Sequence, residues 1–192
     1  NFSFLDPYYT IDGVSRGYSV FFRKSDFQER NIARFSTDTY GGSVNFGYPV
    51  SEVSRLGFSV GYENTTLKEG IFPAQEISQF LASEGKAFDL FSVTASYTMS
   101  ALNRGLLPTA GKSQSFSFEL TVPGSELEFA RFNYNGQIFF PLGRSLVLRL
   151  RADLGYGEAY GDTKVFPFYK NFFTGGMGAV RGYETNSLGP QA

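Results

Sequence analysis

The chain has 192 residues, with 22 Phe, 12 Tyr and 22 Gly but no Trp, Cys or His. The lack of Cys excludes disulfides and thiolate metal sites, and the lack of both His and Cys excludes the usual Ser-His-Asp and Cys-His catalytic arrangements. The net charge is −1, from 17 basic and 18 acidic residues spread along the chain, which argues against a nucleic-acid partner. We therefore expect no enzyme activity, no catalytic residues, no cofactor and no metal.

Apolar residues alternate with small polar ones along most of the chain, which is the period-two pattern of β-strands. No run approaches the roughly 18 consecutive apolar residues of a transmembrane helix. Segment 2–9 is a weak strand candidate, and segment 15–23 has Tyr18, Val20 and Phe22 on one face. Six further segments alternate more strictly: 40–48, 56–62, 91–99, 115–122, 130–140 and 146–154. The sequence predicts about eight strands, most of them near the roughly 9–11 residues that cross a membrane obliquely.

The connections between these segments alternate in length. Three are short and rich in Pro, Gly, Asp and Ser: 10–14, 49–54 and 141–145. Three are long and polar: 24–39, 64–86 and 157–192. Two fit less well, because 100–112 is long for a turn and 124–128 is short for a loop. Short turns at one end and long loops at the other are the arrangement of outer-membrane barrels.

The same alternation also fits a soluble β-sandwich, whose apolar face packs against a second sheet. Three features favour the membrane barrel: strands longer than the usual five to six residues or so, a small and polar opposite face, and aromatic residues near the strand ends. Those aromatic residues are Tyr40, Tyr48, Tyr62, Tyr97, Phe140 and Tyr156. We predict an all-β fold in which residues 1–156 form part of the wall of an antiparallel transmembrane β-barrel.

Five charged residues fall on the polar face of the predicted strands: Glu119, Arg131, Arg149, Arg151 and Asp153. An Arg or Lys that faced lipid at the membrane midplane would cost roughly 2–4 kcal/mol. We therefore expect these five side chains to face the barrel lumen. Because both signs of charge share this face, mutual pairing is a simpler interpretation than acid–base catalysis.

Two glycine-rich segments imitate nucleotide-binding motifs. Residues 105–113 have five residues between the glycines where a phosphate-binding loop has four, and a predicted strand follows where that loop needs a helix. In residues 175–182 the third glycine is misplaced, and no βαβ unit surrounds the segment. We interpret the first segment as a turn between strands and assign no nucleotide to either.

Three segments resemble the BamA family of outer-membrane protein assembly factors. Residues 6–15 are similar to a periplasmic turn of the family, and residues 103–111 are similar to another turn. The most specific segment begins at residues 167–176 and continues through Val180-Arg181-Gly182-Tyr183 to residues 186–190. It resembles extracellular loop six of the family, which has a Val-Arg-Gly-aromatic core. The resemblance spans essentially the whole chain.

The resemblance implies a sixteen-stranded outer-membrane barrel that follows periplasmic POTRA domains. This chain would hold about the fourth to the eleventh strand, and we expect both of its ends to be cuts through the larger protein. Residues 157–192 would be loop six, which in the family folds into the lumen. Arg181 would then contact later strands that lie outside this chain. Without the motif, an exposed loop arginine would be the simpler interpretation of Arg181.

The resemblance also implies a function, which is the folding and insertion of unfolded β-barrel proteins into the outer membrane. The implied partners are those proteins, the outer-membrane lipids, and the accessory lipoproteins of the BAM complex, which would bind through the POTRA domains. Two alternatives stay open. One is a two-partner secretion exporter of the same superfamily, although residues 6–15 and 171–176 favour the BamA family. The other is a complete small structural barrel, for which segment 2–9 is too short a first strand.

Overall fold

The structure, a computed structural model, describes residues 1–26, 35–69, 81, 85–143, 145–176, 180–184 and 187–189. Its strands form one antiparallel sheet in chain order from the first to the last. They are β1 (Phe2–Asp6), β2 (Ser15–Asp26), β3 (Phe35–Ser51), β4 (Ser54–Glu69), β5 (Ala87–Leu102), β6 (Gly111–Thr121), β7 (Phe129–Pro141) and β8 (Val147–Ala159). A 3₁₀ turn, Phe168–Lys170, follows β8. The prediction of an all-β fold with eight antiparallel strands is confirmed. The described residues include no helix that is long and apolar enough to span a membrane.

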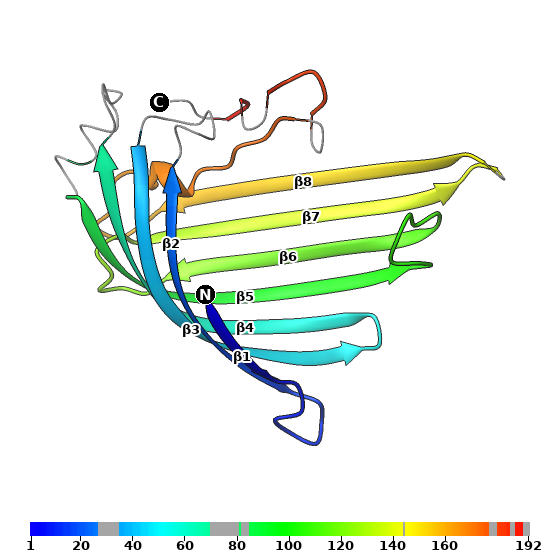
Figure 1. The fold of residues 1–192 in the computed structure, drawn as a ribbon, viewed down its shortest axis with the longest axis horizontal. Helices are drawn as coiled ribbons and strands as arrows, with labels where there is room; N and C mark the ends of the chain where they lie inside the picture. Colours follow the sequence, from blue (N-terminus) through cyan, green and yellow to red (C-terminus); the bar gives the residue numbers. More distant parts are fainter. Residues whose placement is uncertain are drawn as a thin grey trace.

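The sheet is open and strongly curved. In Figure 1, β2 and β3 rise at one side while β5 to β8 run across the view, so that the sheet encloses a trough. Among the described strands, β1 and β8 are the two edges and do not pair with each other. The sheet therefore has the shape of part of a barrel wall. It is not a closed eight-stranded barrel, and no second sheet covers it within the described residues, as a sandwich would require.

The two ends of the sheet differ in their connections. At one end, which we call the turn end, β1 joins β2, β3 joins β4, β5 joins β6 and β7 joins β8. The β3–β4 turn is the tightest, and the longer β5–β6 connection is closed by the Asn103 side chain, which accepts hydrogen bonds from the backbone N–H groups of Thr109 (3.1 Å) and Ala110 (3.2 Å). The opposite end, the loop end, holds the remaining connections and the segment that follows β8. The expected connection 100–112 lies at the turn end, as its place in the alternation predicted, but it is shorter than expected, because β5 continues to Leu102 and β6 begins at Gly111.

The strands extend further at the loop end than the alternation predicted. The bounds expected for the loops 24–39 and 64–86 are wrong, because β3 already begins at Phe35 and pairs there with Glu69 of β4. The register continues without a break from this pair to Pro49 and Arg55. Parts of the expected loops, residues 27–34, 70–80 and 82–84, lie outside the described residues. Strand β8 likewise continues three residues beyond 156, to Ala159.

The convex face of the sheet is apolar over the middle of the strands. Toward the turn end, neighbouring rings form a ladder across three strands, with centroid distances of 6.2 Å between Tyr97 and Phe116 and 4.7 Å between Phe116 and Tyr134. Tyr48 and Tyr40 lie on this face of β3, eight residues apart. At a rise of about 3.3 Å per residue they are separated by about 26 Å along the strand, close to the height of the lipid-facing band of an outer-membrane barrel.

The polarity of the two faces exchanges near the loop end. Beyond the ring pair of Tyr62 and Phe91 (5.1 Å), the convex face becomes polar, with Asn64, Asp89 and a Lys68–Asp38 ion pair. At the same level the concave face changes from small polar residues to buried apolar ones: Phe35, Leu67, Phe88, Leu90 and Phe129. Strands that leave lipid and enter water must turn their apolar side inward, so this exchange marks where the lipid-facing band ends. A soluble sandwich would keep one polarity along each face.

Candidate functional site

The segment that follows β8 packs against the concave face of the sheet (Figure 1). We call residues 160–176 the inner segment. Three of its rings contact aromatic residues of the wall: Phe168 lies edge-on to Phe35 (4.8 Å), Phe166 edge-on to Phe129 (5.6 Å), and Tyr169 stacks on Phe88 (6.5 Å). Phe88 and Phe129 are fully buried. The inner segment is therefore held by an apolar core that the strands supply only at their loop ends.

Two glycines of β8 make room for the inner segment. A Cβ atom on Gly155 would lie 2.5 Å from the Phe172 ring, and a Cβ on Gly157 would lie 2.5 Å from the Phe166 ring. These glycines are two residues apart, so both open on the concave face. A side chain at either position would occupy the space that a ring fills. Because both positions are glycine, the rings of the inner segment can lie directly against the β8 backbone.

A half-buried ion pair ties the inner segment to β4. The Lys170 Nζ donates to Glu63 Oε1 at 2.9 Å, and the two side chains are only 16% and 24% exposed. The Thr65 hydroxyl donates to the same carboxylate oxygen at 3.0 Å. Burial, and secondarily the charge of Glu63, raises the pKa of the neighbouring Tyr169 phenol, which therefore stays neutral. Lys170 is thus the cation that balances Glu63 on the concave face.

Glu128, in the connection between β6 and β7, fixes the place where the chain leaves β8. Its backbone N–H donates to the Thr163 hydroxyl at 2.7 Å, and its carbonyl accepts from the Tyr160 N–H at 3.0 Å. Its carboxylate accepts from the N–H groups of Asp162 (3.2 Å) and Gly124 (3.3 Å). The inner segment therefore begins at a fixed point, and its direction is set before its rings reach the core.

The five predicted lumen charges all lie on the concave face, and four of them form two pairs. Arg131 approaches Glu119 at 3.9 Å and lies over the Phe172 ring of the inner segment at 4.8 Å. Arg151 donates from Nε to Asp153 at 2.6 Å. The fifth residue, Arg149, lies 5.7 Å from the centroid of the Phe139 ring. That this face becomes the lumen of a complete barrel stays a prediction.

The predicted Val-Arg-Gly-Tyr motif lies in a hairpin beyond the inner segment. Thr174 and Leu188 pair through two backbone hydrogen bonds of 2.8 and 2.9 Å, and the Gly176 N–H donates to the Tyr183 carbonyl at 3.1 Å. Gly182 has a φ of +93°, which favours glycine at this turn. Val180 and Tyr183 are exposed, and Arg181 has no polar partner among the residues described. Residues 177–179, 185–186 and 190–192 of the predicted loop lie outside the described residues. The contact of Arg181 with later strands stays a prediction.

Sequence reasoning missed the residues that hold the inner segment in place. Lys170 fell inside a segment that was expected to be a loop, and Glu63 fell between the expected strand 56–62 and the expected loop 64–86, so nothing in their spacing paired them. Gly155 and Gly157 carried a usable signal, since two glycines at alternate positions on the polar face of a strand indicate close approach of another backbone or ring. The aromatic residues at 166, 168 and 169 lie in the inner segment, and their burial depends on residues far away in the chain.

A curved sheet with an apolar convex band, a polar concave face and an inward-packed segment is the wall of a transmembrane β-barrel of the bacterial outer-membrane type. The model of the Omp85 superfamily domain matches residues 1–192. The chain belongs to the Omp85 superfamily, and it is part of an outer-membrane β-barrel.

Two relatives show which members of the superfamily the chain resembles. The chain is 33% identical over 199 residues to the outer membrane protein assembly factor BamA of Neisseria meningitidis serogroup B (strain ATCC BAA-335 / MC58), an alignment that covers 98% of this chain and 25% of that protein. It matches the crystal structure of BamA from Haemophilus ducreyi lacking POTRA domains 1–3, with a TM-score of 0.87, 29% identity, and coverage of 98% of this chain and 38% of that one. The predicted resemblance to the BamA family is confirmed. The chain spans well under half of either relative.

Proposed function

We propose that this chain is part of the barrel of an outer-membrane protein insertase, which folds β-barrel proteins and inserts them into the outer membrane. The observation that supports this most is the 33% identity to an outer membrane protein assembly factor over 98% of the chain. The packing of the segment after β8 on the concave face agrees with it, since the resemblance implied a loop six folded into the lumen.

In this proposal the chain contributes a wall and an inner segment and performs no bond chemistry, so it is not an enzyme. The pairing of β2 to β5, whose register shifts only between Pro49 and Ser51, and the core around Phe88 and Phe129 would make the wall stiff. The seam at which incoming strands pair would lie at other strands of the complete barrel, where unpaired edge N–H and C=O groups can template a new strand. A stiff wall opposite such a seam would let the seam open without collapse of the lumen.

The partners follow from the same proposal. Unfolded outer-membrane β-barrel proteins would be the substrates, and the convex band with its ring ladder would contact outer-membrane lipids. Accessory lipoproteins of the BAM complex would bind through the POTRA domains of the complete protein. Cofactors, metals and nucleic acid have no role in the proposed function.

Depletion of the full-length protein in its host tests the proposal. Outer-membrane porins migrate differently on gels before and after heating only when they are folded, so their folded fraction can be followed during depletion. We expect folded porins to decline together across many different barrel proteins. If they persist while a single secreted polypeptide disappears from the medium, the protein is a two-partner secretion exporter and the proposal is wrong.

A further inference from the structure

The concave faces of β7 and β8 form an elongated groove that the proposed function does not use. We call it the amide groove, and its defining residues are Asn133, Asn135, Gln137, Arg149, Arg151 and Asp153. It consists of two hollows of about 280 and 520 Å³, which share Asn135, Arg151 and Asp153. The first opens toward the turn end, and the second ends beneath Phe172 and the Thr174–Leu188 pair. The groove thus runs along the strands from the turn end to the inner segment.

The spacing of the groove matches an extended polypeptide. The three amide side chains lie at alternate positions of β7, so they are about 6.6 Å apart along the strand. An extended peptide repeats its outward N–H and C=O groups at the same two-residue interval, and each amide can both donate and accept. From Arg149 to Gly155 the groove spans six residues, or about 20 Å. A single small ion would contact only a small part of a groove of this length.

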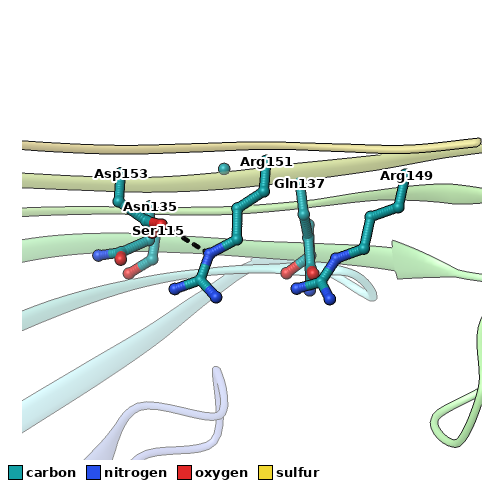
Figure 2. A pocket seen from close by; sticks show the side chains of 8 residues that line it. Ser115, Asn135, Gln137, Arg149, Arg151 and Asp153 are labelled. Carbon is teal, nitrogen blue, oxygen red and sulfur yellow. Dashed lines mark ion pairs between the residues drawn. The ribbon is translucent and has the colours of Figure 1, made fainter. Parts of the chain in front are cut away.

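The charge of the groove favours an acidic occupant. Arg149 and Arg151 occupy alternate positions of β8, and in Figure 2 both side chains reach in the same direction, alongside Gln137 and Asn135. Asp153 is the one acidic residue of the groove and binds Arg151 through Nε at 2.6 Å. Arg149 has no hydrogen bond or ion pair with any residue that the structure describes, and its side chain is exposed. Two guanidinium groups against one carboxylate give the groove a net charge of +1.

We propose that the amide groove binds an extended, acidic polypeptide segment that enters from the turn end. The β7 amides would bond its backbone, and Arg149 would take a carboxylate in a charge-assisted pair. A lipid is a poor occupant, because amide and guanidinium side chains line the groove along β7 and β8 and the rings of Phe172 and Phe173 lie only at its inner end. The proposal rests on the proposed function and names a surface that would hold an unfolded chain. Peptide binding can be measured without any assembly activity, so the two proposals can fail separately.

The test uses the full-length protein in detergent and two fluorescent eight-residue peptides, one of alternating Ser and Asp and one of alternating Ser and Asn. Fluorescence anisotropy should show tighter binding of the acidic peptide, weakened by added salt. The double variant Arg149→Gln/Arg151→Gln should bind it at least about tenfold more weakly, the worth of a lost charge-assisted hydrogen bond. The matched control is Arg104→Gln, an exposed arginine in the β5–β6 connection. Equal binding of both peptides, or no effect of the double variant, would overturn the proposal.

Two further measurements exclude other occupants. Inorganic phosphate should compete only weakly, whereas complete displacement of the peptide by millimolar phosphate would mean that the groove takes small anions and not a peptide. A cysteine introduced as Gln137→Cys in the full-length protein should react with a charged maleimide, and the acidic peptide should slow that reaction. If this cysteine is unreactive in the folded protein, other strands of the same barrel fill the groove and the proposal fails.

Discussion

Replacing Gly155 with alanine should loosen the inner segment from the wall. The new Cβ would lie 2.5 Å from Phe172 Cδ1 and 2.7 Å from both Cγ and Cε1 of the same ring. Ordinary carbon–carbon contacts are about 3.5 Å or longer, so the ring must move by roughly 1 Å. Because Cγ lies on the χ2 axis, turning the ring about χ2 cannot clear the contact, and either χ1 of Phe172 or the backbone of the inner segment must change. The same ring lies 4.8 Å from the Arg131 guanidinium, and that contact would be disturbed as well.

We expect Gly155→Ala to cost about 1–3 kcal/mol of barrel stability, the usual range for an overpacked site. The assay is thermal unfolding of the full-length protein in detergent, followed by gel mobility, together with limited proteolysis in residues 160–176. The variant should unfold at a lower temperature and be cut faster in this segment. The matched control is Gly143→Ala in the β7–β8 turn, where a Cβ would have nothing within 4 Å. Equal stability of both variants would refute the argument that Gly155 accommodates the Phe172 ring.

Three further predictions concern the loop end. Phe129→Ala, at the centre of the buried cluster, should cost about 3–5 kcal/mol in the same unfolding assay; a loss below about 1 kcal/mol would mean that the cluster does not hold the inner segment. Lys170→Met should destabilise the barrel by about 1–2 kcal/mol, because it leaves the half-buried Glu63 carboxylate without its cation. Adding Glu63→Gln should recover part of the loss, and additive effects in this double-mutant cycle would contradict the Lys170–Glu63 ion pair. The hydrogen bond from Lys68 lowers the pKa of Asp38 below 3.8, so its contribution is complete above about pH 4 and is lost as the pH falls through the lowered value. Asp38→Asn should therefore be less stable than the wild type at pH 6, and the difference should shrink as the pH falls through the lowered pKa of Asp38; a difference that does not depend on pH would be contrary to this assignment.

The period-two pattern predicted the existence and order of all eight strands, because alternation depends only on neighbours along the chain. It underestimated the length of β3 and β4, where the concave face carries Phe35 and Leu67 in place of small polar residues. The apolar residues change face there because the strands leave lipid. The period-two rule assumes that each face keeps one polarity, so it interprets that change as the end of a strand.

The position of the five charges on the concave face could be predicted, because a charge is costly on the lipid face wherever its partner lies. The structure pairs Arg131 with Glu119 and Arg151 with Asp153, as the mixture of signs suggested. The contacts of the inner segment could not be predicted. Lys170 and Glu63 are 107 residues apart, and no local pattern encodes a contact at that separation.

Site-directed spin labelling of the full-length protein in lipid tests the central claim, that the convex band faces lipid and the two faces exchange polarity at the loop end. Labels at Phe118 and Leu150 on the convex face should be accessible to oxygen, which concentrates in lipid. Labels at Ser117 on the concave face, and at Thr66 on the convex face beyond the ring pair, should be accessible to a water-soluble relaxation agent. Lipid exposure at Ser117, or the same environment at Phe118 and Thr66, would contradict the account.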